Sequence, residues 1–569
     1  MRRVELGGPE IRRSALVAGF ALAAALSGST PSGAQIEPIS ETVDVRVVNV
    51  EVVATDNQGI IIRGLTRDDF ELVVDGREIP IEYFSAVEAP LLAESTAQAA
   101  ADPRAESLPL LIINYDARFL TVGSARDALE TLRSHMGELL ESTRAIMIAR
   151  QGMSLVVEQP FTRDRARLEA ALSRLIGMNV PVRSTVGRSL VISELERIPD
   201  AAMSGFTEED EGALDIALQL LNQVRTQSAE ERGVQRTAIA QLEWLIGSVA
   251  GLPGRKALLY VGPGIQPQPA EALYRLWWAR FSSLANQLNV LSIESEMGLD
   301  IASAQVTDLL ARANESQVTF YGYDPRGVRA QSSLEFESFE ASEYSERDVR
   351  AAQQWILSVA EGSGGAGRID SADLDGLVTE MTGSFRNYYS LGFSPANGFP
   401  DRGKVRVRLA NLEGRVRHFD RYLTRSGTRE LQELTLAALL TEMVVNSMDV
   451  QVEMDDAVPQ VDGTFVIPIL VKIPIASLSL LPKGQQHVGK LSVVVQAQGS
   501  GGEISEPAEG VVAVELDNDD LLKSLGGMAG YRLRMRVSSG EQRIAIGVRD
   551  EVAQRDSAVR LVIQAGRDS

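Results

Sequence analysis

The feature that most constrains the fold is an apolar run at residues 110–113, which leads into the polar residues Asn114 and Asp116 (LLIINYD). A run without polar alternation is typical of a strand buried on both faces, as in a parallel sheet covered by helices. Open α/β sheets place their ligands in the loops that follow such strands. The sequence therefore predicts a central strand over residues 108–116, with Asp116 at the edge where a site could form.

Segments with the pattern of helices and of strands alternate after this strand. Residues 124–140 carry apolar side chains at helical spacing, and Thr162 is expected to cap a second helix that buries Leu168, Leu172 and Leu175. The strands expected between and after these helices cover residues 144–149, 154–157, 254–261 and 318–323. Such alternation predicts a doubly wound, mainly parallel sheet.

The length of 569 residues predicts several domains. Residues 36–87 show strand alternation and an Asp75-Gly76 hairpin turn, which indicate an N-terminal β-sandwich-like module. The further expected divisions are a linker at 88–106, the α/β domain at 107–425 with a helical insertion at 178–250, and a C-terminal helix plus β-sandwich at 428–569. The insertion is expected to hold two helical stretches, 213–224 and 234–249.

The start of the chain predicts export. Two arginine pairs precede an apolar run at residues 15–26, and the small residues 32–34 follow it. This order is that of a secretory signal peptide, expected at residues 1–34 with cleavage near Ala34. No later run reaches eighteen apolar residues, so the mature chain is expected to lack a membrane span. We expect it in the periplasm or outside the cell.

Composition excludes several kinds of chemistry. The chain has no cysteine, which removes zinc–thiolate sites, cysteine nucleophiles and disulfides. Its three histidines (His135, His418 and His487) lie on separate segments, which disfavours a Ser-His-Asp triad. The formal net charge of −21 argues against nucleic acid as a partner. The sequence therefore predicts a protein that is not an enzyme.

Several short segments, taken in their order and spacing, resemble the bacterial von Willebrand factor A-related family. They are residues 110–116, 161–165 (FTRDR), 254–258 (GRKAL), 321–327 (YGYDPRG) and 388–395 (YYSLGFSP). The resemblance covers residues 108–425 and extends to the β modules at both ends. It implies a von Willebrand A-like sheet and recognition of proteins through the loops at its carboxyl edge.

The same resemblance implies a position for a metal ion. Family members commonly hold Mg²⁺ with an Asp-x-Ser-x-Ser loop, a threonine from a second loop and an aspartate from a third, because Mg²⁺ prefers oxygen ligands. Here the first loop keeps Asp116 but replaces both hydroxyl positions, one of them by Arg118. Thr162 could stand for the second-loop ligand, while the third loop reads Gly-Pro-Gly at 262–264. We expect a degenerate site in which Arg118 or backbone N–H groups hold Asp116, with no metal or cofactor.

The predicted function is that of an exported, non-enzymatic protein–protein interaction or scaffold protein. Candidate partner-binding residues are Arg118 and, in an acidic segment with interspersed aromatics, Phe336 and Phe339. Two alternatives stay open: a Mg²⁺-dependent adhesion module using Asp116 and Thr162, and a hydrolase of unknown type. The second needs a nucleophile–base pair or paired carboxylates, which the sequence does not supply. The partner and the oligomeric state stay open as well.

Overall fold

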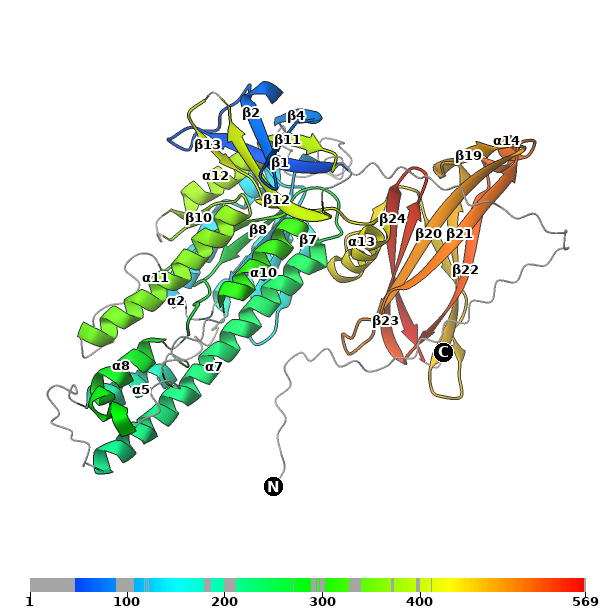
Figure 1. Cartoon of the computed structure of the whole chain (residues 1–569). Helices are drawn as coiled ribbons and strands as arrows, with labels where there is room; N and C mark the ends of the chain where they lie inside the picture. The colour runs from blue at the N-terminus through cyan, green and yellow to red at the C-terminus, as the bar shows by residue number, and fades with distance from the viewer. Residues whose placement is uncertain are drawn as a thin grey trace. The chain divides into compact units, whose positions relative to one another are not determined.

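The computed structural model describes residues 47–88, 107–116, 118, 120, 122–178, 186–198, 211–269, 271–287, 293, 296, 302–326, 339–369, 373–395, 400–410 and 412–566 (Figure 1). The chain divides into two compact units, one covering Asp44–Arg425 and one containing Ser426–Ser569. The expected signal peptide and linker lie outside the described residues.

The first unit is built around a mixed, mainly parallel sheet with the strand order β10-β9-β8-β5-β6-β7. Its parallel strands are β5 (Leu110–Asp116), β6 (Ala145–Gln151), β8 (Lys256–Val261), β9 (Val318–Tyr323) and β10 (Gly367–Arg368). β7 (Val156–Thr162) runs antiparallel to β6 at the edge. Every residue of β5 is buried, which confirms the predicted central strand.

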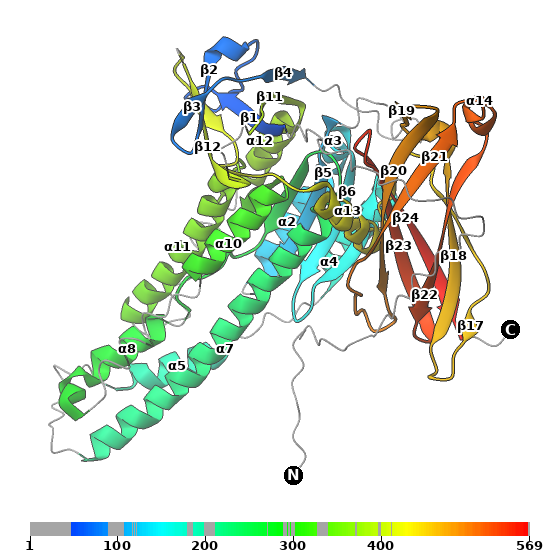
Figure 2. The same ribbon diagram turned by 45° about the vertical axis from the view of Figure 1, so that its right-hand side comes forward.

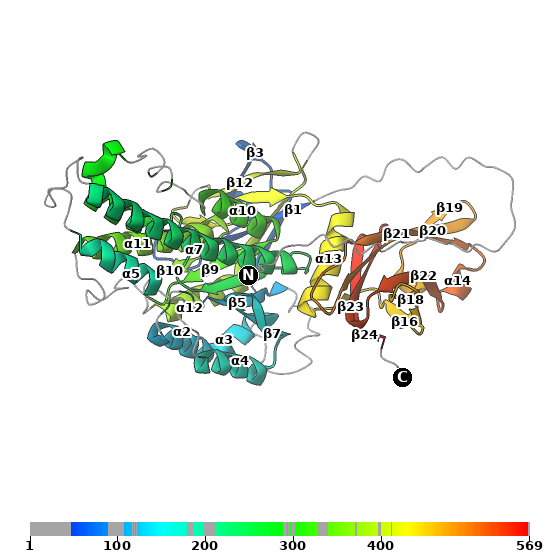
Figure 3. The same cartoon turned by 90° about the horizontal axis from the view of Figure 1, so that it is seen from below.

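Helices cover both faces of this central sheet (Figure 3). One face packs against α2 (Val122–Ser134), α3 (Met136–Glu141), α4 (Arg165–Gly177) and α12 (Leu374–Arg386). Their apolar stripes bury the residues expected from helical spacing, among them Leu129, Leu132, Leu168 and Leu172. The other face is covered by α7 (Glu211–Val249), α10 (Ala302–Glu315) and α11 (Phe339–Gly362). The α/β class predicted from the alternation is confirmed.

A helical arm extends from the carboxyl edge of the sheet (Figure 2). It combines α5 (Val186–Glu196) and the first half of α7 with α8 (Glu271–Phe281) and the 3₁₀ helix η3 (Ser282–Gln287). These elements share an apolar core that includes Leu195, Leu221, Trp277 and Phe281. The arm therefore comes from two insertions, one on each side of β8. The two helical stretches expected from the sequence are a single helix, α7.

The strands of the expected N-terminal module do not pair mainly among themselves. β1 (Val48–Thr55) and β4 (Tyr83–Glu88) flank β11 (Asn387–Phe393), and β13 (Arg415–Arg417) extends β1. β2 (Phe70–Val74) lies between its hairpin partner β3 (Arg77–Ile79) and β12 (Arg402–Leu409), which also pairs with β14 (Arg421–Leu423). The two antiparallel sheets share one core. This β module therefore joins segments more than 300 residues apart.

The second unit is a β-sandwich with one covering helix, α13 (Gly427–Thr441). The first sandwich sheet has the order β15-β24-β23-β20-β19, with β21 on the free side of β20, and the second contains β16, β17, β18 and β22. The bounds of its long strands are β18 Phe465–Pro474, β20 Gln486–Gln498, β21 Ala508–Asp517, β22 Met528–Val537, β23 Gly540–Asp550 and β24 Arg555–Ala565. The short strands are β15 Val445–Asn446, β16 Gln451–Met454, β17 Val458–Pro459 and β19 Leu481–Lys483. The predicted antiparallel strands are thus present. Within the described residues, no helix is long and apolar enough to cross a membrane.

Candidate functional site

The candidate site lies at the carboxyl edge of the central sheet, where β5 ends at Asp116. The side chain of Asp116 is 1% exposed, although it is a carboxylate in a position where α/β sheets bind ligands. Arg118, two residues further on, is only 7% exposed. A buried charge needs a partner of opposite sign, so each of these two side chains requires one close by.

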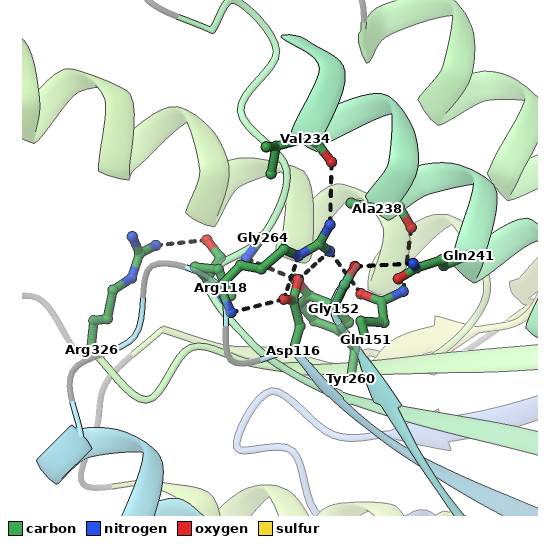
Figure 4. A network of polar contacts seen from close by, with 11 residues as sticks. Asp116, Arg118, Gln151, Gly152, Val234, Ala238, Gln241, Tyr260, Gly264 and Arg326 are labelled. Carbon is green, nitrogen blue, oxygen red and sulfur yellow. Dashed lines mark hydrogen bonds and ion pairs between the residues drawn. The ribbon is translucent and has the colours of Figure 1, made fainter. Parts of the chain in front are cut away.

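They neutralise each other through a bidentate ion pair (Figure 4). Arg118 Nε donates to Asp116 Oδ1 and Arg118 Nη2 donates to Asp116 Oδ2, both at 2.7 Å. The backbone N–H of Arg118 also donates to Asp116 Oδ1, at 3.1 Å. Parallel N–H···O bonds of this kind are among the strongest in proteins. Asp116 is thus held both by the Arg118 side chain and by a backbone N–H, which the sequence offered as alternatives.

The remaining donors of Arg118 connect the site to α7. Nη1 donates to the carbonyl of Val234 at 3.2 Å, and Nη2 donates to Gln151 Oε1 at 3.0 Å. Gln151, the last residue of β6, in turn donates to the carbonyl of Ala238 at 3.3 Å. Gln241 of α7 donates to the carbonyl of Gly152 at 3.1 Å (Figure 4). These bonds fasten the middle of α7 across the edge of the sheet.

β8 supplies a third group to the carboxylate. The hydroxyl of Tyr260 donates to Asp116 Oδ2 at 2.9 Å and accepts a bond from the backbone N–H of Gly264 at 3.2 Å. A Cβ on Gly262 would lie 2.7 Å from the Cβ of Asp116, and a Cβ on Gly264 would lie 2.3 Å from the carbonyl oxygen of Ala352. The Gly-Pro-Gly loop thus lets β8 approach Asp116 and α11 closely.

A second aspartate and arginine repeat this arrangement at the end of β9. Asp324 is fully buried, and Arg326 donates to it through its backbone N–H and Nε at 3.0 Å and through Nη2 at 2.9 Å. Arg326 Nη2 also donates to the carbonyl of Pro263 at 2.6 Å. The loops after β5, β8 and β9 are therefore joined by two internal Asp-x-Arg pairs.

Burial and charge act together on the titratable groups of the site. Burial by itself would lower the pKa of Arg118, but the charge and hydrogen bonds of Asp116 outweigh it, so the pKa of Arg118 is raised. Burial and the neighbouring Asp116 charge raise the pKa of Tyr260 well above its ordinary value. Arg118 therefore stays a cation and Tyr260 stays a hydroxyl donor, and together they balance the charge of Asp116.

These contacts do not fit a divalent metal. Both oxygens of Asp116 face the guanidinium of Arg118, which occupies the direction from which a cation would approach. Among the residues that the structure describes, no group of three or more His, Cys, Asp or Glu side chains is placed to hold a metal ion.

Thr162, expected to lie near Asp116, is at the amino edge of the sheet, whereas Asp116 is at the carboxyl edge. Asp116 is in register with Gln151 at the end of β6, whereas Thr162 is in register with Ile146 near its start. Five residues of strand separate the two positions by about 16 Å. The turn after β6 is tight, so β7 runs antiparallel and ends at the amino edge of the sheet, away from Asp116. The cap of α4 is also Asp164, whose side chain accepts from the N–H of Arg167, and not Thr162.

The other predicted candidates have different outcomes. Arg118 was expected to be available to a partner, but its burial and its four internal hydrogen bonds remove it from the surface, which corrects that expectation. Phe336 lies outside the described residues. Phe339 is the first residue of α11, and its side chain lies outside the described part of the chain.

Sequence reasoning missed Tyr260 and the Asp324–Arg326 pair. No sequence pattern marks Tyr260, because its contact with Asp116 depends on the pairing of β5 with β8. The second pair did have a signal in the sequence. The same pattern, Tyr-Asp-x-Arg, occurs at the ends of two expected strands, at residues 115–118 and 323–326.

Two solved structures show distant likenesses to this chain. No protein-family model matches the chain, and no curated protein does. The three N-terminal domains of the type V pili tip protein Mfa5 from Porphyromonas gingivalis match with 9% identity over 91% of this chain and 77% of that chain, at a TM-score of 0.21. Northeast Structural Genomics Consortium target SoR45 matches with 11% identity over 22% of this chain and 91% of that chain, at a TM-score of 0.16. Likenesses this low support no inference about fold or function.

Proposed function

We propose that this chain is an exported, non-enzymatic protein–protein interaction or scaffold protein, built on a von Willebrand A-like domain whose metal position is taken by an internal cation. The observation that carries the proposal is the guanidinium of Arg118 on both oxygens of Asp116. An adhesion site of that family offers a metal as an electrophile to a partner's carboxylate. Here the positive charge belongs to the chain itself and is buried, so recognition would use other surfaces.

The contacts of the histidines support a role without catalysis. His418 accepts from the backbone N–H of Val407 and hydrogen-bonds the carbonyl of Phe419, so both of its ring nitrogens serve the β module. His135 lies between the carboxylates of Glu138 and Asp375. In the part of the chain that the structure describes, no histidine nitrogen hydrogen-bonds a serine or threonine hydroxyl, the arrangement that nucleophilic catalysis by these residues commonly uses.

The helical arm is the surface that we assign to the partner. Its apolar core lets it stand as a rigid projection beyond the carboxyl edge of the sheet. Three large apolar side chains of α5 and α7 are exposed there: Leu190 at 61%, and Ile216 and Leu218 at 42% each. Exposed aliphatic side chains on rigid helices are suited to a protein partner, because their burial costs little conformational entropy.

The absence of a metal requirement can be tested by isothermal titration calorimetry. Titration of Mg²⁺ and Mn²⁺ into the mature chain should give no heat of binding at millimolar concentrations. Asp116→Ala serves as the control variant. Binding by the wild type that disappears in Asp116→Ala would support a metal-dependent adhesion module and refute the proposal.

The interaction role needs a separate experiment. The mature chain would be used as bait in cross-linking pull-downs from envelope and extracellular fractions of its source cells. We expect specific capture that the exposed-surface change Ile216→Arg reduces, while Met153→Ser, at an exposed position in the turn between β6 and β7, leaves it unchanged. No captured protein, or capture equal in both variants, would reject the arm as the binding surface.

A further inference from the structure

The sandwich of the second unit has two long strands with a free edge. β21 pairs with β20 over all ten of its residues, and β22 pairs with β18 over all ten of its residues. No other strand of the described residues pairs with either of them. Each therefore presents a row of backbone N–H and C=O groups on one side, which is a template for a further strand.

These two edges carry opposite charges. The outward-facing side chains of β22 include Arg532, Arg534 and Arg536, which alternate with its buried residues. The outward-facing side chains of β21 include Glu509, Glu515 and Asp517.

Most of these charges lack a strong partner within the chain. Arg532, Arg534 and Glu515 have no hydrogen bond or ion pair with a described residue, while Arg536 pairs with Asp462 at 3.1 Å across exposed positions. The carboxylates of Glu509 and Asp517 accept hydrogen bonds from the side-chain amides of Gln432 and Gln486, respectively, which are uncharged. Both rows are therefore available to charges of opposite sign.

The two edges also lie on the same side of the sandwich. A Cβ on Gly510 of β21 would lie 2.7 Å from the hydroxyl of Tyr531 of β22. Only residues 518–527, which contain the short helix α14 (Leu521–Ser524), connect the two strands. They consequently run in opposite directions along neighbouring edges (Figures 1 and 3).

We propose that a second copy of this chain docks on this side, with β21 of each copy pairing antiparallel with β22 of the other. A two-fold axis parallel to the strands brings both complementary pairs together at once, so the assembly closes as a dimer. Both sandwich sheets then continue across the interface. The acidic side chains of one copy meet the arginines of the other on the same face of each extended sheet.

The charges select this arrangement over the other two-fold pairing. Turning the second copy about an axis across the strands would place β22 beside β22 and arginine beside arginine, and like charges on directly opposed residues are destabilising. Charged edges commonly protect sheets from pairing with identical edges. Here the same charges allow one pairing, between the unlike edges. The inference concerns the second unit and does not depend on the function proposed for the first.

Charge reversal tests the pairing on the full mature chain. We expect analytical ultracentrifugation to show a monomer–dimer equilibrium at micromolar concentrations. Arg532→Glu combined with Arg534→Glu should raise the dissociation constant at least tenfold. Adding Glu509→Arg and Glu515→Arg to the same chain should restore dimerisation, because the two edges are then complementary again. A monomer at 100 µM, an open series of larger species, or a dimer insensitive to the reversal would overturn the proposal.

Disulfide trapping tests which strands meet. The natural chain has no cysteine, so single introduced cysteines report only their own contacts. The contact of Gly510 with Tyr531 sets the heights of the two strands, so Glu509 of one copy lies opposite Arg532 of the other. Under mild oxidation, an equimolar mixture of Glu509→Cys and Arg532→Cys chains should therefore form cross-linked dimers, whereas either variant alone should not. Cross-links in the single-variant samples at the level of the mixture would show pairing of like edges and reject the arrangement. Far-ultraviolet circular dichroism identical to wild type confirms that each variant is folded.

Discussion

At the scale of single residues, Arg118 determines what the carboxyl edge of the central sheet can do. The side chain replaces an external cation with a tethered one and uses its other donors to hold Gln151 and α7. A tethered cation needs no uptake from solution and cannot be exchanged. The carboxyl edge is therefore structurally fixed, and we expect partner recognition to use the helical arm that this edge supports.

Removing one partner of this buried pair should be costly, because the other charge stays buried without compensation. We expect Arg118→Ala to lower the free energy of unfolding of the first unit by about 3–5 kcal/mol. Urea denaturation of the mature chain measures the change. Arg126→Ala is the matched control, because Arg126 pairs with Glu130 at the surface and such pairs contribute at most about 1 kcal/mol. Equal effects of the two substitutions would contradict the role assigned to Arg118.

The local part of this site could be predicted from the sequence, and the distant part could not. Arg118 and Asp116 are two residues apart, so any backbone that follows a strand end keeps them within reach. The position of Thr162 depends on the direction of β7, which a single tight turn reverses. The contact of Tyr260 depends on strand pairing across 144 residues, for which the alternation of apolar residues contains no information.

At the scale of elements, α7 is one continuous helix where the sequence predicts two. Its central part contains polar residues and Gly233, a sequence typical of a break between two helices. In the structure Ser228, Glu231 and Gln235 are buried there. Glu231 pairs with Arg188 of α5, and the neighbouring backbone bonds Arg118. Polar contacts with the sheet edge and α5 thus take the place of an apolar stripe and keep the helix continuous.

Gly233 offers a direct test of that continuity. A glycine inside a helix is less favourable than alanine by about 0.5–1 kcal/mol, and a Cβ at this position would meet no other atom within 4 Å. Gly233→Ala should therefore raise the free energy of unfolding by that amount, as measured in urea. Gly264→Ala is the opposite control, since its φ of +78° and its close approach to Ala352 should make alanine destabilising. A loss of stability in Gly233→Ala would indicate a break in α7.

The junction of α13, β23 and β24 predicts a pH dependence of the second unit. Burial raises the pKa of Asp556 to about 6, and the nearby Glu430 and Glu551 add to this, while Arg549, 2.8 Å away, opposes it. Because the folded-state pKa lies above the unfolded value of 3.8, the stabilising contribution is full below pH 4. It is then lost as the pH rises through about 6. The difference between the folded and unfolded pKa of Asp556 corresponds to about 3 kcal/mol in the free energy of unfolding.

This contribution can be isolated by comparing two chains at two pH values. The free energy of unfolding of the second unit would be measured at pH 4.5 and pH 7.5 for wild type and for Asp556→Asn. The pH dependence attributable to Asp556 should be absent from the variant, which should lose less stability than wild type as the pH rises. The same pH dependence in both chains would show that Asp556 titrates as an exposed aspartate.

At the scale of the whole molecule, the fold class could be predicted from the sequence, but the pairing of strands far apart in the chain could not. The α/β alternation and the C-terminal strands were both recognisable, because each depends on local periodicity. The strands of residues 48–88 were equally recognisable as strands. Their partners, β11 and β12, come from beyond residue 386, and an alternating strand fits many partners equally well. Proximity in sequence therefore suggested a separate module where the structure has an interleaved one.

Truncation distinguishes a separate module from an interleaved one. A chain that starts at residue 107 keeps the entire central sheet but loses β1 to β4. Val50 and Val52, which lie opposite Leu391 and Tyr389, would be missing, and the apolar face of β11 and β12 would be open to water. Each large side chain so exposed costs about 1.5–3 kcal/mol, against a total stability of about 5–15 kcal/mol for a domain. We expect residues 107–425 to be insoluble or to unfold without cooperativity, whereas residues 36–425 should stay soluble and give one sharp transition in urea. A soluble 107–425 fragment with the same midpoint would mean that the N-terminal strands form an independent module after all.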